Sequence, residues 1–540
     1  MKKDKKRQFN VSEFLSQKQN IKFTIIIGGG VVGLVIIYLI FSAIFSGPSK
    51  ADIKMAKESE RISAGVIDYL NGLPQAQDVQ LLKLFQKGFS LYEMGNYADA
   101  IYNFNTALML KTEDKEKVAL LTLNGNSYIL LSNPKEAQSQ YGRALPIAEK
   151  TEDQSALAAV WGNIGLAYQK MESLDSAQIF QKKAVDLYTK LGSKKEEAIQ
   201  LSNVGTIFLT RQDLDLALKF HQEALKLFEE INYPLGEIDQ LGIIGWIYQS
   251  RQSYDTSLSY YHQALDKSIQ IAFAAGEANQ LSNLGLVYQN KGIPDAALDY
   301  YQQALEIDKK NGTKLGEAQD YLTIGWVYEK KGDLDEAIKK YESSVNINRK
   351  IGYKQGESAA LTSIAMAYQR KNDLDGAMKN LSLALDASAE AGNKSSQANQ
   401  LHMIGQLYKV KGEVDSALQS YQKAEKIYSE IGDRIGQARQ LNNIAQILKS
   451  KGNTKEALTY YQQALQITRD YKDKYGEASI LSNIAFSYIN QGDSKSGLEY
   501  ANAALKIFQE IGAQKEAQTV EENIKKVEEL ISRDTTKTNK

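Results

Sequence analysis

Small and apolar residues recur along most of this chain with a fixed period of forty residues. A small residue stands at every fortieth position from 125 to 485, with no insertion or deletion between copies. These small positions are Gly125, Gly165, Gly205, Gly245, Gly285, Gly325, Ala365, Gly405, Ala445 and Ala485. One earlier copy, thirty-seven residues before Gly125, has Gly88. Self-similarity at a fixed period indicates a repeat architecture, so the pattern predicts a solenoid of about eleven units.

Within one unit, the apolar spacing and the punctuating residues predict two helices. Gly292 follows the first segment, where glycine is typical of a helix C-cap. In the next unit Asp333, with Glu336 three residues on, is typical of an N-cap. Glycine at Gly285 costs about 1 kcal/mol of helix propensity relative to alanine. We therefore expect it to allow a close approach of the paired helix, with Ala297 facing it.

The recurring residues also carry a resemblance to a known family. A small residue, a tyrosine three positions later, and then a small residue, an aromatic residue and an alanine form the motif Gly285, Tyr288, Ala297, Tyr301 and Ala304. This motif resembles the tetratricopeptide repeat, and its forty-residue form resembles the long-helix subclass of peptide-binding scaffolds. The resemblance covers roughly residues 77 to 532. It implies an all-α, right-handed superhelical solenoid of helix pairs, with the first helix of each pair lining a concave face.

Both ends of the chain differ from the repeats. Residues 77–512 hold the predicted solenoid, and 513–532 align with a first helix but carry Lys525 at the small position. We expect 513–532 to form a polar capping helix and 533–540 to be a disordered tail. Residues 46–76, which contain Pro48, are predicted to be a linker.

The N-terminal residues predict a membrane anchor. Residues 1–22 are basic, and residues 23–45 carry no charge. Twenty-three helical residues span about 35 Å, enough for a bilayer core of about 30 Å. The alternative, a cleaved signal peptide, is disfavoured because its apolar run is usually shorter. The flanking charges predict a single-pass membrane protein with a cytoplasmic N-terminus and extracytoplasmic repeats. Gly29 and Gly33 suggest a homodimer face, although small residues are common in such helices.

Composition limits the chemistry. The chain has 65 Lys and Arg against 65 Asp and Glu, so its charge gives no argument for a nucleic-acid partner. Cysteine is absent, and histidine occurs three times. No metal-ligand spacing, phosphate-binding loop or nucleophile motif occurs. The sequence therefore predicts no catalytic residue, metal site or cofactor. His221 falls at a position that tyrosine usually holds, so we expect it in the core.

Recurring asparagines on the first helices are candidates for binding a peptide backbone. They stand two residues before the small position, at Asn163, Asn203, Asn283, Asn443 and Asn483. A side-chain amide can both donate to and accept from an extended backbone. The alternative is that these amides bond the neighbouring loop and hold the stack together.

Three further residues complete the candidate site. Trp246 and Trp326 directly follow small positions and could anchor apolar side chains of a partner. The alternative is that the ends of long first helices bury them. Arg370 belongs to a group of basic residues in the C-terminal half that favours an acidic stretch in the partner.

These observations predict a membrane-anchored interaction scaffold, not an enzyme, that binds a peptide or a partner protein in the concave groove. Two alternatives stay open: a self-assembling scaffold of a membrane-associated complex, and a regulatory peptide sensor. The identity of the partner does not follow from fold resemblance.

Overall fold

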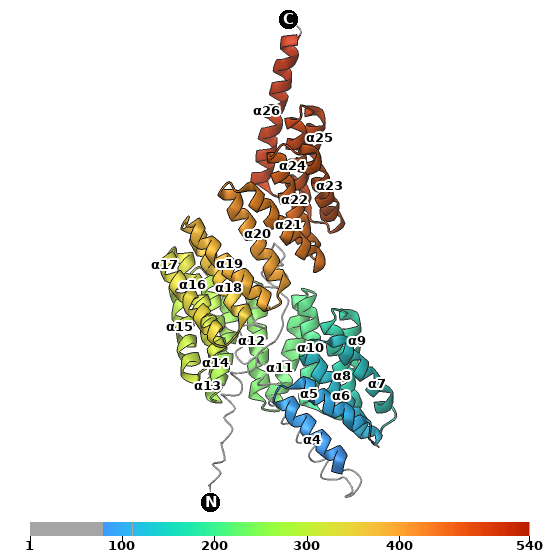
Figure 1. The fold of residues 1–540 in the computed structure, drawn as a ribbon. Coiled ribbons are helices and arrows are strands. Elements are labelled where there is room, and N and C mark those ends of the chain that lie inside the picture. Colours follow the sequence, from blue (N-terminus) through green and yellow to red (C-terminus); the bar gives the residue numbers. More distant parts are fainter. Residues whose placement is uncertain (1–78, 111, 539–540) are drawn as a thin grey trace, which may run out of the picture. The chain divides into compact units, whose positions relative to one another are not determined.

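The computed structural model describes residues 79–110 and 112–538. These residues form 23 helices, α4 to α26, and contain no strand (Figure 1). In chain order the helices make eleven consecutive pairs, and α26 follows the last pair. The prediction of an all-α helical-repeat fold is confirmed.

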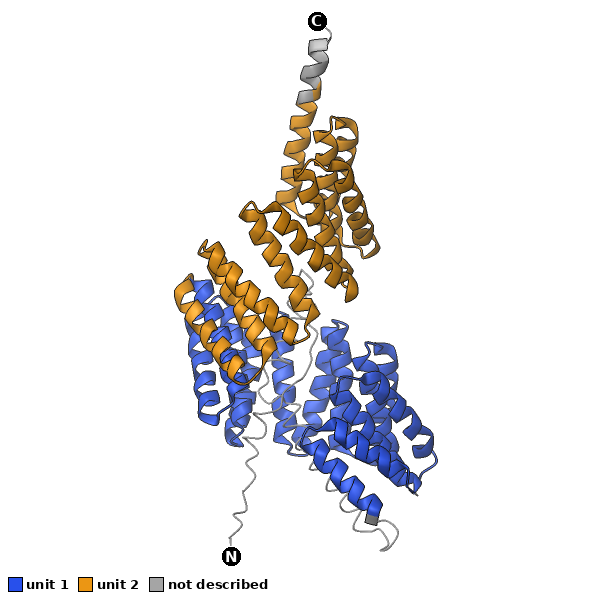
Figure 2. Ribbon diagram, viewed as in Figure 1, with its two compact units in different colours: residues 1–21, 41–331 blue, residues 22–40, 332–540 orange. Residues whose placement is uncertain are grey.

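The helices fall into two compact units (Figure 2). Unit 1 ends at Lys331 and contains α4 (Val79–Glu93), α5 (Tyr97–Leu108), α6 (Asp114–Leu130), α7 (Pro134–Ala148), α8 (Gln154–Lys170), α9 (Leu174–Leu191), α10 (Lys194–Thr210), α11 (Leu214–Glu230), α12 (Pro234–Ser250), α13 (Tyr254–Gln270), α14 (Ala274–Asn290), α15 (Pro294–Asn311) and α16 (Lys314–Lys331). Unit 2 contains α17 (Leu334–Lys350), α18 (Lys354–Arg370), α19 (Leu374–Glu390), α20 (Lys394–Val410), α21 (Val414–Glu430), α22 (Arg434–Ser450), α23 (Thr454–Asp470), α24 (Lys474–Asn490), α25 (Ser494–Glu510) and α26 (Gln514–Thr538). Within each unit, every helix packs on the next. We call the even-numbered helices α4 to α24 the first helices and the odd-numbered ones the second helices.

Helix length and loop length together set the forty-residue period. Most helices have 17 residues, as in α12 and α13, and most are joined to the next helix by three residues. Each of these tight loops contains a residue with positive φ, such as Gly292 at +74°. Gly292 directly follows α14 and its C-cap, Lys291, as the sequence predicts. Loops without glycine place Glu172 and Gln212 in the same left-handed region, at 61°.

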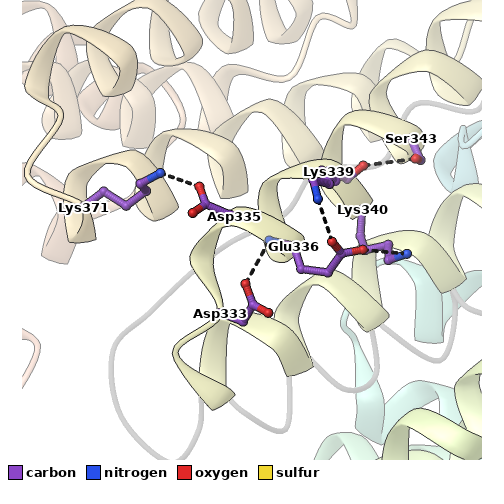
Figure 3. Close-up of polar contacts among 7 residues, drawn as sticks. All are labelled: Asp333, Asp335, Glu336, Lys339, Lys340, Ser343 and Lys371. Carbon is purple, nitrogen blue, oxygen red and sulfur yellow. Dashed lines mark hydrogen bonds and ion pairs between the residues drawn. The ribbon is translucent and has the colours of Figure 1, made fainter.

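Side-chain caps and ion pairs fix the start of the second helices. Figure 3 shows Asp333 accepting a hydrogen bond from the backbone N–H of Glu336 at 3.1 Å, which confirms the predicted N-cap. The Glu336 carboxylate pairs with Lys339 and Lys340. The neighbouring Asp335 forms an ion pair with Lys371 at the end of the next first helix. The same pairing, thirty-six residues apart, recurs as Asp175–Arg211, Asp215–Arg251, Asp255–Lys291, Asp295–Lys331, Asp375–Lys411 and Asp415–Lys451.

In most pairs the two helices meet where a ring packs against a glycine. A Cβ atom on Gly285 would lie 2.8 Å from the Cε1 atom of the Tyr301 ring, which is 1% exposed. The expected close approach is present, and the side chain nearest to that Cβ position is Tyr301. Tyr301 donates its hydroxyl hydrogen bond to Gln289 at 3.2 Å. We call the position sixteen residues after each small position the aromatic position; it also holds the buried residues Tyr141, Gln181, His221, Tyr261, Tyr341, Leu381, Tyr421, Tyr461 and Ala501.

His221 lies in the core, as the sequence predicts. Its side chain is 0% exposed, and its Nδ1 atom lies 2.8 Å from Oε1 of Gln240. Burial lowers its pKa from 6.5 to about 4. The histidine therefore stays neutral in the folded chain under conditions in which the unfolded chain binds a proton.

The structure does not support the expected single-pass membrane location. Within residues 79–110 and 112–538, no helix is both long enough and apolar enough to cross a bilayer. The segment 23–45, on which that expectation rested, lies outside the described residues, as do 1–22, 46–76, Gly29 and Gly33. At the other end, α26 continues to Thr538, past residue 533 where the predicted tail begins.

Gly285→Leu should destabilise the chain by about 1 to 3 kcal/mol, because the new side chain has no space beside Tyr301. Thermal unfolding of the full chain measures the loss. Gly142→Leu is the matched control, since no atom lies within 4 Å of a Cβ atom placed on that helical glycine. Equal melting temperatures for both variants would contradict the role assigned to Gly285.

His221→Gln, which copies Gln181, should protect the chain against acid. The folded pKa of about 4 lies below the unfolded 6.5, so the histidine removes stability as the pH falls through this interval. Relative to the original chain, the variant should gain about 2 kcal/mol between about pH 8 and about pH 5. Urea unfolding at both pH values tests this, and a pH-independent difference would refute it.

Candidate partner-binding face of the first helices

The eight candidate residues divide between the two units. Unit 1 holds Asn163, Asn203, Trp246, Asn283 and Trp326, and unit 2 holds Arg370, Asn443 and Asn483. All eight lie on first helices. They therefore form two sets, one in each unit.

Two of the asparagines of unit 1 bond within their own helices. Asn203 donates to Gln200 and Asn283 donates to Gln280, each at 3.2 Å. Asn163 is half-buried at the equivalent position.

The asparagines of unit 2 link neighbouring first helices. Asn483 Nδ2 on α24 donates to Oδ1 of Asn442 on α22 at 2.9 Å. Asn443 Nδ2 lies 3.5 Å from Nδ1 of His402 on α20. In both units the amides bond first-helix side chains, and not the loops that the sequence-based alternative named. An amide group has two N–H donors and one acceptor oxygen, so these bonds leave capacity for a partner.

The two tryptophans have different surroundings. Trp246 is 5% exposed, which agrees with the buried alternative. Trp326 is 38% exposed, and Nζ of Lys330 lies 4.8 Å from the centre of its ring. Of the pair, Trp326 alone presents a substantial surface.

Two lysines of unit 2 occupy a position that supports the core in unit 1. There Gln249 and Gln289 accept hydrogen bonds from the buried hydroxyls twelve residues on. Lys409 and Lys449 replace these glutamines, and the hydroxyl of Tyr461 has no partner. Because an unpaired buried hydroxyl is costly, lysine at these positions does not serve core stability.

Both lysines reach the next first helix instead. Nζ of Lys409 on α20 donates to Oε1 of Gln446 on α22 at 3.0 Å. Nζ of Lys449 on α22 lies 4.2 Å from the ring centre of Phe486 on α24. Phe486 is 52% exposed, and burial lowers the pKa of Lys449. Lysine, amide and aromatic side chains thus form one surface over α20, α22 and α24.

This surface is basic because acids are nearly absent from it. Helices α20 and α22 contain no Asp or Glu, and α18 and α24 contain one Glu each. Glu357 is buried and pairs with Arg349 and Lys354, and Glu477 is buried and pairs with Arg469 and Lys474. We call the exposed and half-buried side chains of α18, α20, α22 and α24 the basic face. It includes Met366, which is 42% exposed, and the exposed Arg370.

Unit 1 differs in charge. Every first helix of unit 1 except α8 carries at least one acid, and α16 alone carries Glu317, Asp320 and Glu329. Among the described residues of the whole chain, no group of three or more His, Asp and Glu side chains is arranged to hold a metal ion.

Sequence reasoning counted Lys409 and Lys449 with Arg370 in the basic group of the C-terminal half, but did not include them, or Phe486, among the candidate site residues. The signal was present: lysine stands four residues after the small position, where four other units have glutamine (Gln169, Gln249, Gln289 and Gln369). Only the contacts show that these lysines turn away from Tyr421 and Tyr461 toward the neighbouring first helix.

The tetratricopeptide repeat model matches residues 116–190, 156–230, 240–310, 276–350 and 396–470, which together make up more than half of the chain. The chain belongs to the tetratricopeptide repeat family. No curated protein matches it in sequence.

Solved tetratricopeptide-like structures resemble this chain at low identity. The apo form of RapI is 15% identical, with 51% of this chain and 100% of RapI covered and a TM-score of 0.41. The apo form of the quorum sensor NprR from B. thuringiensis is 16% identical, with coverage of 66% and 100% and a TM-score of 0.41. Yeast Tom70 is 15% identical, with coverage of 85% and 97% and a TM-score of 0.39.

Trp246→Ala should cost about 3 to 5 kcal/mol, because it empties a buried site. Trp326→Ala removes a partly exposed ring and should cost about 1 kcal/mol or less. Thermal unfolding of the two single variants compares the losses directly. A similar loss of stability in both variants would contradict the assignment of Trp246 to the core and of Trp326 to the surface.

Proposed function

We propose that this tetratricopeptide repeat protein is a non-catalytic binding scaffold and that the basic face of unit 2 binds an extended, acidic segment of a partner protein. The observation that carries the proposal is the charge of the first helices. Those of unit 2 hold eight Lys or Arg side chains against two Glu. Of the eight, Lys354, Lys394 and Lys474 form ion pairs with Glu357, Glu430 and Glu477, and Lys409 and Lys449 contact uncharged side chains.

Lys409 and Lys449 support an acidic occupant. Their nearest contacts, Gln446 and Phe486, carry no charge, so a carboxylate could form charge-assisted hydrogen bonds with the ammonium groups. Carboxylates of a partner would also be attracted by the surrounding cations, which favours fast association.

Apolar and amide side chains would supply the remaining contacts. Phe486 and Met366 expose enough surface to pack against an apolar side chain of the segment. The unused capacity of Asn443 and Asn483 can pair with its backbone. The segment would need to be extended to contact several first helices in turn.

A fluorescent peptide of alternating Glu and Leu tests the proposal. We expect it to bind the full chain with an affinity that falls as salt rises, whereas a peptide with Gln in place of Glu should bind at least about tenfold more weakly. Fluorescence anisotropy measures both affinities. Equal binding of the two peptides, or no binding of either, would overturn the acidic specificity.

Charge reversal locates the binding surface. Lys409→Glu with Lys449→Glu should weaken the Glu-Leu peptide at least about tenfold. The matched control is Lys423→Glu with Lys455→Glu, which makes the same charge change at exposed positions of the second helices α21 and α23. Equal weakening by both double variants would mean that overall charge, and not the basic face, binds the peptide.

A further inference from the structure

Three carboxyl groups are buried together where α15 meets α16. Asp308 lies on α15 and is 7% exposed, while Glu317 and Asp320 lie on α16 and are 8% and 5% exposed. Asp320 interacts electrostatically with both of the others. We call these three residues and their contacts the acidic joint. It lies wholly in unit 1, apart from the basic face.

The other repeats place neutral side chains where the acidic joint has its two aspartates. Ser268, Asn348, Ser388 and Thr468 stand at the position of Asp308. Gln240, Gln280, Gln400 and Gln440 stand at the position of Asp320. All eight of these side chains are buried. Since hydroxyl or amide groups fill both positions elsewhere in the same chain, the fold does not require a carboxyl group at either.

Few cations compensate the acidic joint. Glu317 pairs with Lys314 at 2.6 Å. The equivalents Glu357 and Glu477 each have a second, arginine partner. Lys309, at the position of Arg349, instead lies over the ring of Tyr321, with Nζ 5.0 Å from its centre.

The aspartates have only weak neutral partners. Oδ1 of Asp320 accepts a hydrogen bond from the Ser282 hydroxyl on α14 at 3.3 Å, and its Oδ2 is buried with no partner. Thr313 hydrogen-bonds the Asp308 carboxyl. A buried ionised carboxylate with so few donors is unfavourable, whereas a protonated one is tolerated.

We propose that the acidic joint is a proton-dependent contact: it holds α15 against α16 while its aspartates are protonated, and it loosens when they ionise.

The electrostatics agree in direction. Burial, with Glu317 nearby, raises the pKa of Asp308 from 3.8 to about 7. Burial and the neighbouring Asp308 raise the pKa of Asp320 well above its usual value. The groups that face the pair are Lys309 from α15, Lys314 and Glu317 from α16, and Ser282 from α14, whose one charged residue is Glu277. Because the folded pKa lies above the unfolded 3.8, the joint is most stable in acid and loses stability as the pH rises through about 7.

The joint would act on a residue that a partner can reach. Helix α16 carries Trp326, whose ring is 38% exposed, six residues after Asp320. A change in how α16 packs on α15 would alter the surface around that ring. The chain would then present this part of unit 1 differently at mildly acidic and mildly basic pH.

Hydrogen exchange of the full chain, followed by mass spectrometry and corrected for the intrinsic effect of pH, tests the proposal. Protection of α15 and α16 should fall at least about tenfold between about pH 6 and about pH 8, while α8 and α9 change little. In Asp308→Asn with Asp320→Gln, which copies the side chains of other repeats, the fall should disappear. Asp299→Asn, at an exposed position of α15, should behave as the original chain does.

The result can contradict the proposal in two ways. Protection of α15 and α16 that does not depend on pH in the original chain would overturn it. A fall that persists unchanged in the double variant would assign the effect to other groups. Neither result depends on whether the basic face binds an acidic peptide, because the two sites lie in different units and the readout involves no ligand.

Discussion

Most repeats of this protein depend on the contact between a ring and a glycine. In the pair α14 and α15, the ring of Tyr301 occupies the volume that a side chain on Gly285 would need. The same geometry joins Gly125 to Tyr141 and Gly405 to Tyr421. It fixes how deeply the second helix packs on the first, and therefore where the next pair can stack. Not every repeat uses this combination: Ala365 is followed sixteen residues on by the buried Leu381, and Ala445 by the buried ring of Tyr461.

The helical-repeat fold could be predicted from sequence because each unit supplies the same local signals. Glycine at Gly292 and aspartate at Asp333 mark helix ends through short-range hydrogen bonds, and these bonds are present. Gly285 signalled a close approach, but spacing alone could not distinguish Ala297 from Tyr301 as its neighbour. That choice depends on how the two helices are rotated about their axes, which no local signal encodes.

The candidate site was less predictable, for a physical reason. A position on a first helix does not determine exposure: Trp246 and Trp326 stand at equivalent positions, yet one ring is buried and the other is half-exposed. The direction in which a long side chain points also depends on which of several neighbouring residues it contacts. Lys409 and Lys449 could be located in the sequence, but their contacts with Gln446 and Phe486 lie thirty-seven residues away. The loss of a hydroxyl partner at Tyr461 is visible only once the side chains are placed.

The three-residue loops restrict how such a chain can change in length. Each three-residue loop contains one residue in the left-handed conformation, and it has no spare residue to absorb an insertion. Adding one residue within a helix would rotate everything after it by about 100° about the helix axis, so that rings such as Tyr301 would no longer face a glycine. Growth or shortening is therefore tolerated mainly in steps of one whole unit. This explains why the ten copies from residue 125 to residue 485 contain no insertions. The residues on the surface can still differ from unit to unit, because they do not affect the helix register.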